Sequence, residues 1–222
     1  MWLIDSSIGR KLVMSITGFF LILFLIFHMS MNVVAIFSGE AYNTICEFLG
    51  ANWYALVGTA VLAGGFILHI IFATILTLRN KKARPIAYSF QDNQEKVEWS
   101  SRNMFVLGVV VLLGLIMHLS HFWAKMQLPE ILGCEAEYAG QFADGAALIR
   151  ATFANPIICL LYILWFVAIW FHLTHGFWSA FQSAGLDNKT WFPRLKCCAN
   201  IVSTLIFLGF AAVVVAGYIQ SL

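Results

Sequence analysis

Histidine is the residue type in this 222-residue chain whose chemistry and placement most need a reason. All six histidines fall within long apolar stretches: His28, His69, His118, His121, His172 and His175. An ionisable side chain is costly in hydrocarbon, so it usually faces the interior of a helix bundle and serves a function there. Neutral imidazole is also the commonest metal ligand among side chains. The histidines therefore predict a functional site inside an apolar bundle, with metal ligation as the chemistry to test first.

The composition is that of a membrane protein. Hydrophobic residues make up 61% of the chain and charged residues only 11%, against about 25% charged residues in ordinary globular domains. Five apolar segments approach or exceed the roughly 20 residues that a spanning helix needs. Their expected limits are 12–37, 53–79, 102–127, 155–183 and 198–221. The expected fold is therefore all-α, a single domain over residues 1–222 that forms a bundle of five transmembrane helices.

The connections between these segments alternate in charge. Residues 38–52 and 128–154 are acidic on balance, whereas the N-terminal segment, residues 80–101 and the last connection are basic. Of the 13 Lys and Arg residues, all but Lys125 and Arg150 fall on one side of the predicted bundle. The positive-inside rule then predicts a cytoplasmic N-terminus and an external C-terminus.

Four of the histidines pair by depth in this topology. With a rise of 1.5 Å per residue, His69 lies roughly 15 Å from the basic end of its helix, and His172 lies at a similar depth. His28 and His118 lie roughly 24–25 Å from the same side, beyond the midplane. Two pairs of imidazoles at two levels are what two stacked haems with bis-histidine ligation require. The fifth segment contains no histidine.

Glycines accompany three of the four histidines at a spacing of four residues. The pairs are Gly65 with His69, Gly114 with His118, and Gly176 with His172. Residues four apart share a helix face, so these glycines are expected to leave room for a flat macrocycle. The spacing also mildly favours His118 over His121 in HLSH, and His172 over His175 in HLTH. Both alternatives remain open on this ground.

Membrane histidines can also serve purposes that involve no haem. A single membrane histidine often only hydrogen-bonds to a neighbouring helix. A di-iron bundle would need inward-facing carboxylates, and no predicted span contains one. The five cysteines include no CxxCH motif, which argues against covalently attached haem.

Four stretches carry a resemblance to a known family: LILFLIFHMSMN, GGFILHIIFA, IMHLSHFW and FHLTHGFWSAF. Over nearly the whole chain the sequence resembles the dihaem cytochrome b subunit of succinate:quinone oxidoreductases, the five-helix membrane anchor of succinate dehydrogenase and quinol:fumarate reductase. The family pattern of H-x-x-x-G followed by two aromatic residues falls on His172, Gly176, Phe177 and Trp178, which selects His172 over His175. Some relatives carry a glutamate just before the fourth ligand. Here that region is Ala168 to Phe171, which puts a carboxylate proton path through this helix in doubt.

The resemblance implies two b haems, the proximal one held by His69 and His172 and the distal one by His28 and His118. It also implies flavoprotein and iron–sulfur subunits on the cytoplasmic face of a bacterial inner membrane, a heterotrimer that could pair into a dimer, and a membrane quinone, commonly menaquinone. Dicarboxylate chemistry would belong to the partners. It would run as succinate oxidation in the tricarboxylic acid cycle or as fumarate reduction in anaerobic respiration. No nucleic-acid partner is expected.

Two further pairs of residues complete the predicted site. Glu40 and Glu47, on the acidic connection after the first span, are candidates for proton exchange at a quinone site. Ordinary solvated carboxylates would look the same. Arg10 and Lys11 are candidates for neutralising haem propionates, although topogenic charge explains them equally well.

Two rival functions remain. Another dihaem membrane cytochrome, of the hydrogenase or formate dehydrogenase type, would also stack two haems, although one histidine on each of four successive helices argues against it. A non-redox transporter would be expected to have structural repeats and broken helices, and the sequence has neither.

Overall fold

A computed structural model describes residues 6–50, 52–83, 99–133, 144–182 and 185–222. It contains five helical runs that are long and apolar enough to cross a membrane. These are α2 (Ser7–Phe37), α4 (Trp53–Ala83), the run Met104–Trp123 made of α6 (Met104–His118) and the π-helix η1 (Leu119–Trp123), α10 (Pro156–Gln182) and α11 (Trp191–Ile219). The expectation of an all-α fold with five candidate spans is confirmed for the described residues.

Two spans begin earlier than the apolar runs predicted, and at each start a polar side chain accepts hydrogen bonds from backbone N–H groups. Ser6 accepts a hydrogen bond of 2.9 Å from the backbone N–H of Gly9, so α2 starts before its basic residues rather than after them. The side chain of Asn188 accepts from the N–H groups of Thr190 and Trp191, at 3.1 and 2.9 Å, and α11 starts there. Hydropathy alone does not detect such caps.

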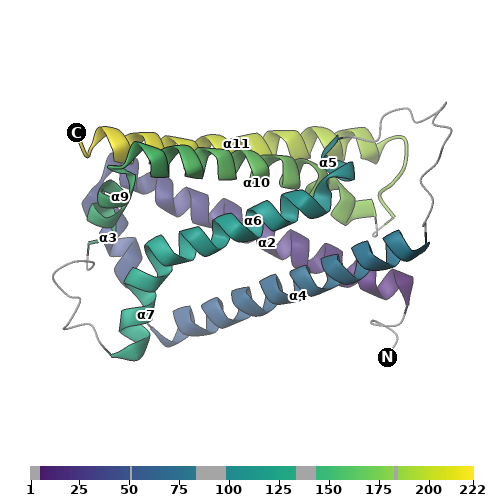
Figure 1. Ribbon diagram of the computed structural model, residues 1–222, viewed down its shortest axis with the longest axis horizontal. Helices are drawn as coiled ribbons and strands as arrows, with labels where there is room; N and C mark the ends of the chain where they lie inside the picture. Colours follow the sequence, from purple (N-terminus) through teal and green to yellow (C-terminus); the bar gives the residue numbers. More distant parts are fainter. Residues whose placement is uncertain (1–5, 51, 84–98, 134–143, 183–184) are drawn as a thin grey trace.

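Within the described parts of the connections there are four shorter helices. They are α3 (Gly39–Phe48), α5 (Trp99–Arg102), α7 (Ala124–Leu132) and α9 (Gly145–Phe153). Helices α3 and α9 pack against each other at the end of the bundle that also holds α7 and the C-terminus (Figure 1). Each begins with a side-chain cap: Ser38 accepts from the N–H of Ala41 at 3.1 Å, and Asp144 accepts from the N–H of Ala147 at 2.8 Å. The acidic connections are therefore folded wherever the structure describes them.

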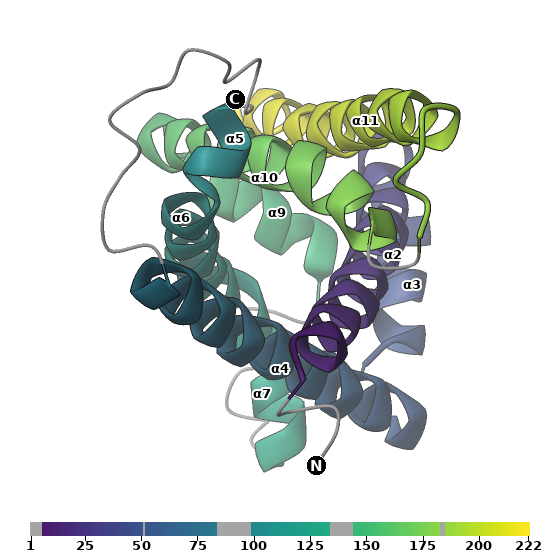
Figure 2. The same ribbon diagram turned by 90° about the vertical axis from the view of Figure 1, so that its right-hand side faces the viewer.

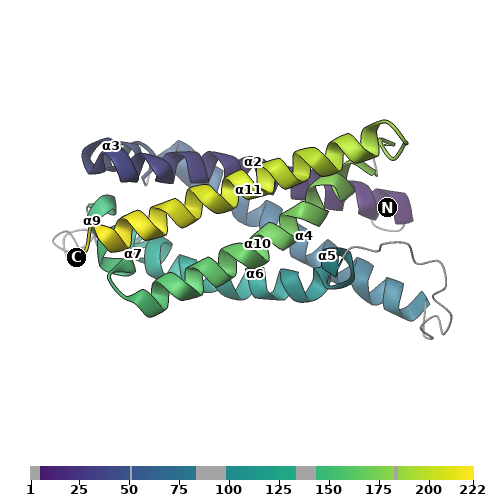
Figure 3. The ribbon, with the colours of Figure 1, turned by 90° about the horizontal axis from the view of Figure 1, so that it is seen from above.

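The long helices form an open four-sided arrangement with one helix outside it. Seen end-on, α2, α4, α6 and α10 surround the axis, and α11 lies against the outside of α10 and α2 (Figure 2). Helices α10 and α11 pack directly against each other (Figure 3). These two helices supply most of the buried side chains, including Tyr162, Ile206 and Val214. Helix α4 packs mainly on α2, and Phe72 is its one buried residue among those described.

Basic residues gather at one end of the bundle. The first turns of α2 and α11, the last turn of α4, and α5 all lie at this end (Figure 1). The basic side chains that these segments carry are Arg10, Lys11, Lys81, Lys82, Arg102, Arg194 and Lys196. Arg84 and Lys96 lie outside the described residues. The basic connections predicted to lie on one side of the membrane therefore lie at the same end of the bundle.

Candidate functional site

The four histidines paired by depth lie opposite one another in the structure. The ring centroids of His69 on α4 and His172 on α10 are 6.4 Å apart, with an interplanar angle of 64°. Those of His28 on α2 and His118 on α6 are 5.8 Å apart, at 82°. We call the first the proximal pair, because it is nearer the basic end, and the second the distal pair. Each of the four helices around the axis contributes one ring.

The spacing within each pair fits a metal ion held between two imidazoles. Metal–nitrogen bonds to histidine are about 2 Å long, so two rings on opposite sides of one ion have centroids roughly 6 Å apart. Both pairs fall near that value. Within the described residues, no group of three or more His, Cys, Asp or Glu side chains gathers for a metal ion. A metal ion held by two imidazoles alone would take the rest of its coordination from a prosthetic group, as in bis-histidine haem.

The hydrogen bonds made by these rings fall on Nδ1. The hydroxyl of Thr17 lies 3.3 Å from Nδ1 of His69, and the side-chain amide nitrogen of Asn32 lies 3.5 Å from Nδ1 of His28. In His118 and His172, Nδ1 is buried and has no partner among the described residues. In His69, an acceptor at Nδ1 would leave Nε2 free to bind a metal, which is the arrangement that second-shell partners of histidine ligands produce.

The second histidine of each HxxH stretch has a different neighbour. His121 lies in η1, where Nδ1 is 3.1 Å from the hydroxyl of Tyr162 and the two rings stack at 5.8 Å. His175 packs edge-on against Trp178 at 4.8 Å. A π-turn within an α-helix often marks a functional site and shifts side chains around the axis. The structure thus puts His118 and His172 in the pairs and His121 and His175 on aromatic neighbours.

The glycines predicted beside the ligands differ in what lies next to them. A Cβ at Gly114 would collide with the indole of Trp165, which packs on α6 and donates a hydrogen bond of 3.1 Å to the carbonyl of Val111. At Gly65 a Cβ would meet the ring of Phe20 at 3.1 Å, and at Gly176 only the tip of Met104 at 3.5 Å. The room beside Gly114 and Gly65 is taken by aromatic side chains. A role for the three glycines in holding a macrocycle stays a prediction.

Two other glycines lie closer to the proximal pair. A Cβ at Gly18 on α2 would stand 3.3 Å from Cε1 of His69, and one at Gly108 on α6 would stand 3.7 Å from Cε1 of His172. Sequence reasoning missed both because neither shares a helix with the histidine it touches. Depth counting along each helix could have suggested them, since both lie in the half of their helix nearer the basic end.

The two predicted propionate partners are placed differently. The side chain of Arg10 is buried, with 7% of its surface exposed, whereas its neighbour Lys11 is exposed. A buried guanidinium inside the basic end is better placed than a solvated amine to act on a group within the bundle. A role in setting membrane orientation explains the exposed Lys11 but does not explain why the side chain of Arg10 is buried.

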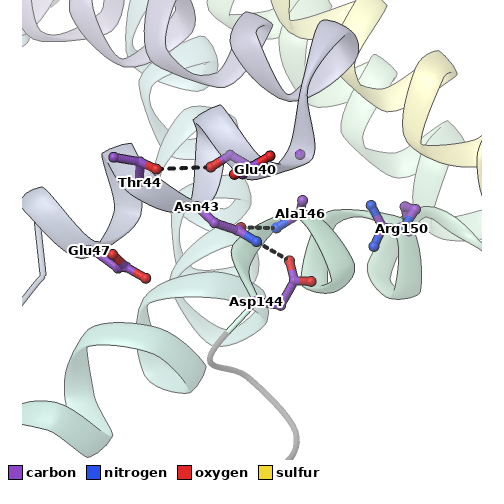
Figure 4. A pocket seen from close by; sticks show the side chains of 8 residues that line it. Glu40, Asn43, Thr44, Glu47, Asp144, Ala146 and Arg150 are labelled. Carbon is purple, nitrogen blue, oxygen red and sulfur yellow. Dashed lines mark hydrogen bonds between the residues drawn. The ribbon is translucent and has the colours of Figure 1, made fainter.

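Glu40 and Glu47 line a depression between α3 and α9 with a volume of about 530 Å³ (Figure 4). Its lining residues are Gly39, Glu40, Asn43, Thr44, Glu47, Asp144, Ala146 and Arg150. The amide of Asn43 joins the two helices, donating to Oδ1 of Asp144 at 2.8 Å and accepting from the N–H of Ala146 at 3.0 Å. Three carboxylates and one guanidinium therefore meet at the end of the bundle opposite the basic cluster.

Local hydrogen bonds tune one carboxyl of this depression. The N–H of Ala147, followed by the amide of Asn43, donates to Asp144 and lowers the pKa of its carboxyl below the ordinary value. On α3, burial raises the pKa of the Cys46 thiol to about 11, so this cysteine stays a protonated thiol at neutral pH.

A short polar chain connects α3 to the distal pair. The hydroxyl of Tyr42, itself buried, donates to Oδ1 of Asn32 at 3.1 Å. The amide nitrogen of Asn32 donates to the backbone carbonyl of His28 at 2.8 Å and approaches Nδ1 of the same ring. Asn32 is four residues after His28, a spacing that could have identified it from the sequence. Tyr42 could not be found that way, because α3 was not expected.

Comparison of the chain with protein-family models, with curated proteins and with solved structures finds no match.

Proposed function

We propose that this chain is the haem-carrying membrane subunit of a succinate:quinone oxidoreductase, in which two b haems pass electrons between partner subunits and a membrane quinone. The supporting observation is the pairing of four histidines from four helices at two levels, with ring centroids 6.4 and 5.8 Å apart. A hydrogen-bonding or transporter histidine has no need of a second histidine facing it at this distance.

The chain's own residues would hold, insulate and orient the prosthetic groups. His69 and His172 would be the axial ligands at the proximal level, and His28 and His118 at the distal level. Because two imidazoles complete the coordination of iron, the haem that they hold would supply one-electron transfer and leave no position for a further ligand. Arg10, buried at the basic end, would neutralise a propionate.

The outer end would serve the quinone. A quinone site needs an apolar pocket, a few polar groups and a source of protons. Glu40 and Glu47 in the depression between α3 and α9 would exchange those protons with the external solution. Menaquinone is the expected substrate, by resemblance of the chain to the dihaem family.

The orientation follows from charge. The basic end would face the cytoplasm of a bacterial cell and bind the flavoprotein and iron–sulfur subunits, and the depression would face outward. Reporter fusions after the last residue of α11 should be active only when the reporter works outside the cytoplasm. A cytoplasmic C-terminus would overturn the orientation and the assignment of partners to the basic end.

The haem content of the purified protein tests the central claim. Isolated in mild detergent from haem-replete cells, the wild-type chain should give two b haems per polypeptide in a pyridine haemochrome assay. The variant with all four paired histidines changed to alanine should give none, and a His121→Ala, His175→Ala double variant should keep two. One haem or none in the wild type would refute the proposal.

A dihaem cytochrome of the hydrogenase or formate dehydrogenase type would pass the haem test too. Affinity purification from the native membrane separates the two possibilities. Co-purification with a flavoprotein and an iron–sulfur protein that together reduce an artificial acceptor with succinate would support the proposal, and co-purification with a metal-dependent hydrogenase or formate dehydrogenase would refute it.

A further inference from the structure

Thr17 is a buried polar residue in α2, and its partner is a histidine on another helix. It is only 8% exposed, and its hydroxyl lies 2.8 Å from the carbonyl of Val13 and 3.2 Å from that of Met14. The same oxygen lies 3.3 Å from Nδ1 of His69 on α4. A threonine hydroxyl within a helix commonly returns its proton to a carbonyl one turn back, which leaves the oxygen lone pairs as acceptors.

The geometry defines which atom donates in the contact with His69. With the proton of Thr17 given to a backbone carbonyl, the hydroxyl oxygen faces Nδ1 as an acceptor. A neutral imidazole that binds a metal through Nε2 carries its one proton on Nδ1. The contact is then Nδ1–H of His69 donating to Oγ1 of Thr17. This selects the tautomer in which Nε2 is free to coordinate.

The distal pair lacks an equivalent acceptor among the described residues. The group nearest Nδ1 of His28 is the amide nitrogen of Asn32, and that nitrogen is a donor because it also bonds to the backbone carbonyl of His28 at 2.8 Å. The amide oxygen of Asn32 is occupied by the hydroxyl of Tyr42. Thus α2 presents an acceptor to the proximal level and a donor to the distal level.

We propose that Thr17 is a positioning residue that holds His69 in its ligating tautomer and lowers the reduction potential of the proximal haem. This inference rests on the proposed function. An acceptor at Nδ1–H makes the imidazole a stronger electron donor, and a more basic ligand stabilises ferric over ferrous iron. Gly18, whose Cβ would touch the ring at 3.3 Å, keeps the approach of α2 close enough for the hydrogen bond.

The test is a redox titration of the haem-loaded protein with three single variants. Thr17→Val keeps the shape and removes the hydroxyl, Thr17→Ser keeps the hydroxyl, and Thr59→Val removes a hydroxyl from α4 whose partner is Gln127, away from the paired rings. The component assigned to the proximal level is the one lost in His69→Ala and His172→Ala. The ferric/ferrous ratio of that component at a fixed potential should fall three- to tenfold in Thr17→Val, which is a rise of about 30–60 mV in its one-electron reduction potential.

The distal component, the control variants and the EPR signal test whether the effect of Thr17→Val is specific to the proximal haem. The distal component should not move in any of the three variants, and Thr17→Ser and Thr59→Val should match the wild type. The low-spin ferric EPR signal of the proximal component should shift in Thr17→Val alone. If Thr17→Val loses the proximal haem, retention of that haem in Thr17→Ser supports the inference, and its loss from both variants overturns it.

Two other results overturn the inference. One is an unchanged proximal potential in Thr17→Val, and the other is an equal shift of both components. Absence of haem from the wild-type protein is a different result, because it refutes the proposed function itself.

Discussion

The proximal histidine pair comes from α4 and α10 and the distal pair from α2 and α6, and the two pairs have different surroundings. Two glycines and one threonine hydroxyl lie against the proximal rings. No phenylalanine, tyrosine or tryptophan of the described residues stacks on either ring. The distal rings are enclosed by aromatic side chains: Phe24, Phe122, Tyr162, Trp165 and Phe210 lie 5.2–6.3 Å from one ring or the other.

The contrast indicates that ring position can be maintained in two ways. Aromatic packing fixes the distal rings through contact area and edge-to-face geometry. A hydrogen bond and a close helix approach fix the proximal ring of His69. The proximal site is thus sensitive to loss of one polar contact, and the distal site to any change in side-chain volume.

The largest expected effect comes from removing a paired imidazole. His69→Ala and His172→Ala should each remove the same haem, and His28→Ala and His118→Ala the other, so that the haem content falls from two to one. Optical spectra and redox titration of each purified variant would show which component is lost. His121→Ala and His175→Ala serve as controls and should keep both. Loss of the same component in His172→Ala and His118→Ala would break the division into two pairs.

A smaller effect is expected from a single methyl group at Gly114. In Gly114→Ala the new Cβ would collide with the indole of Trp165, and overpacking of this kind costs about 1–3 kcal/mol. We expect a lower thermal midpoint in detergent and a perturbed distal haem spectrum. Gly64→Ala on α4 is the matched control, because nothing among the described residues lies within 4 Å of its Cβ.

The proximal counterpart of this substitution is Gly18→Ala. Its Cβ would meet the edge of the His69 ring at 3.3 Å, a much milder contact than the collision with Trp165 at Gly114. Stability should fall less than in Gly114→Ala. Equal losses in the two variants would show that the two levels are packed alike, contrary to the comparison.

Charge at the outer end should affect the quinone reaction selectively. Replacing Glu47 or Glu40 with Gln should lower quinone-coupled turnover about tenfold, because a positioned carboxylate that exchanges protons is lost. Succinate oxidation with an artificial electron carrier should be unchanged. Thr44→Val alters the same depression without removing a carboxylate and should have no effect. Unchanged activity ratios in both glutamine variants would remove these residues from the proposed site.

The smallest effect concerns Asp144, the cap of α9. Asp144→Ala removes the acceptor for Ala147 N–H and for the Asn43 amide, and loss of an N-cap costs about 1 kcal/mol. Faster backbone hydrogen exchange in α9 and α3 would reveal this loss of stability. Hydrogen exchange around the proximal histidines should not change.

The pH dependence of this contact has a definite sign. Because the pKa of Asp144 is lowered in the folded protein, its stabilisation is present above the unfolded value of about 4 and is lost as pH falls through the folded value. Exchange in α9 should therefore quicken below about pH 4 in the wild type and less so in Asp144→Asn. An identical acid response in the two proteins would contradict the assignment.

Hydropathy and helical rise determined much of this protein from sequence alone. Both are local properties, so the number of spans, the basic end and the matched depths of the four histidines could be obtained without coordinates. The choice of His118 over His121 was only weakly favoured, because residues three apart differ little in depth. In the structure, η1 directs His121 toward Tyr162, and the spacing of apolar residues in the sequence does not predict a π-turn.

Only the tertiary structure decided the rotation of each helix about its own axis and the identity of its neighbours. The contact of Thr17 with His69 spans 52 residues, and that of Trp165 with Gly114 joins two helices. The caps of α3 and α9 explain why acidic connections fold into helices that meet over a depression. The depth of a residue in the membrane follows from its position along its own apolar segment. Whether two side chains on different helices face each other depends on how those helices pack, and that packing is selected by the burial of side chains from both helices together.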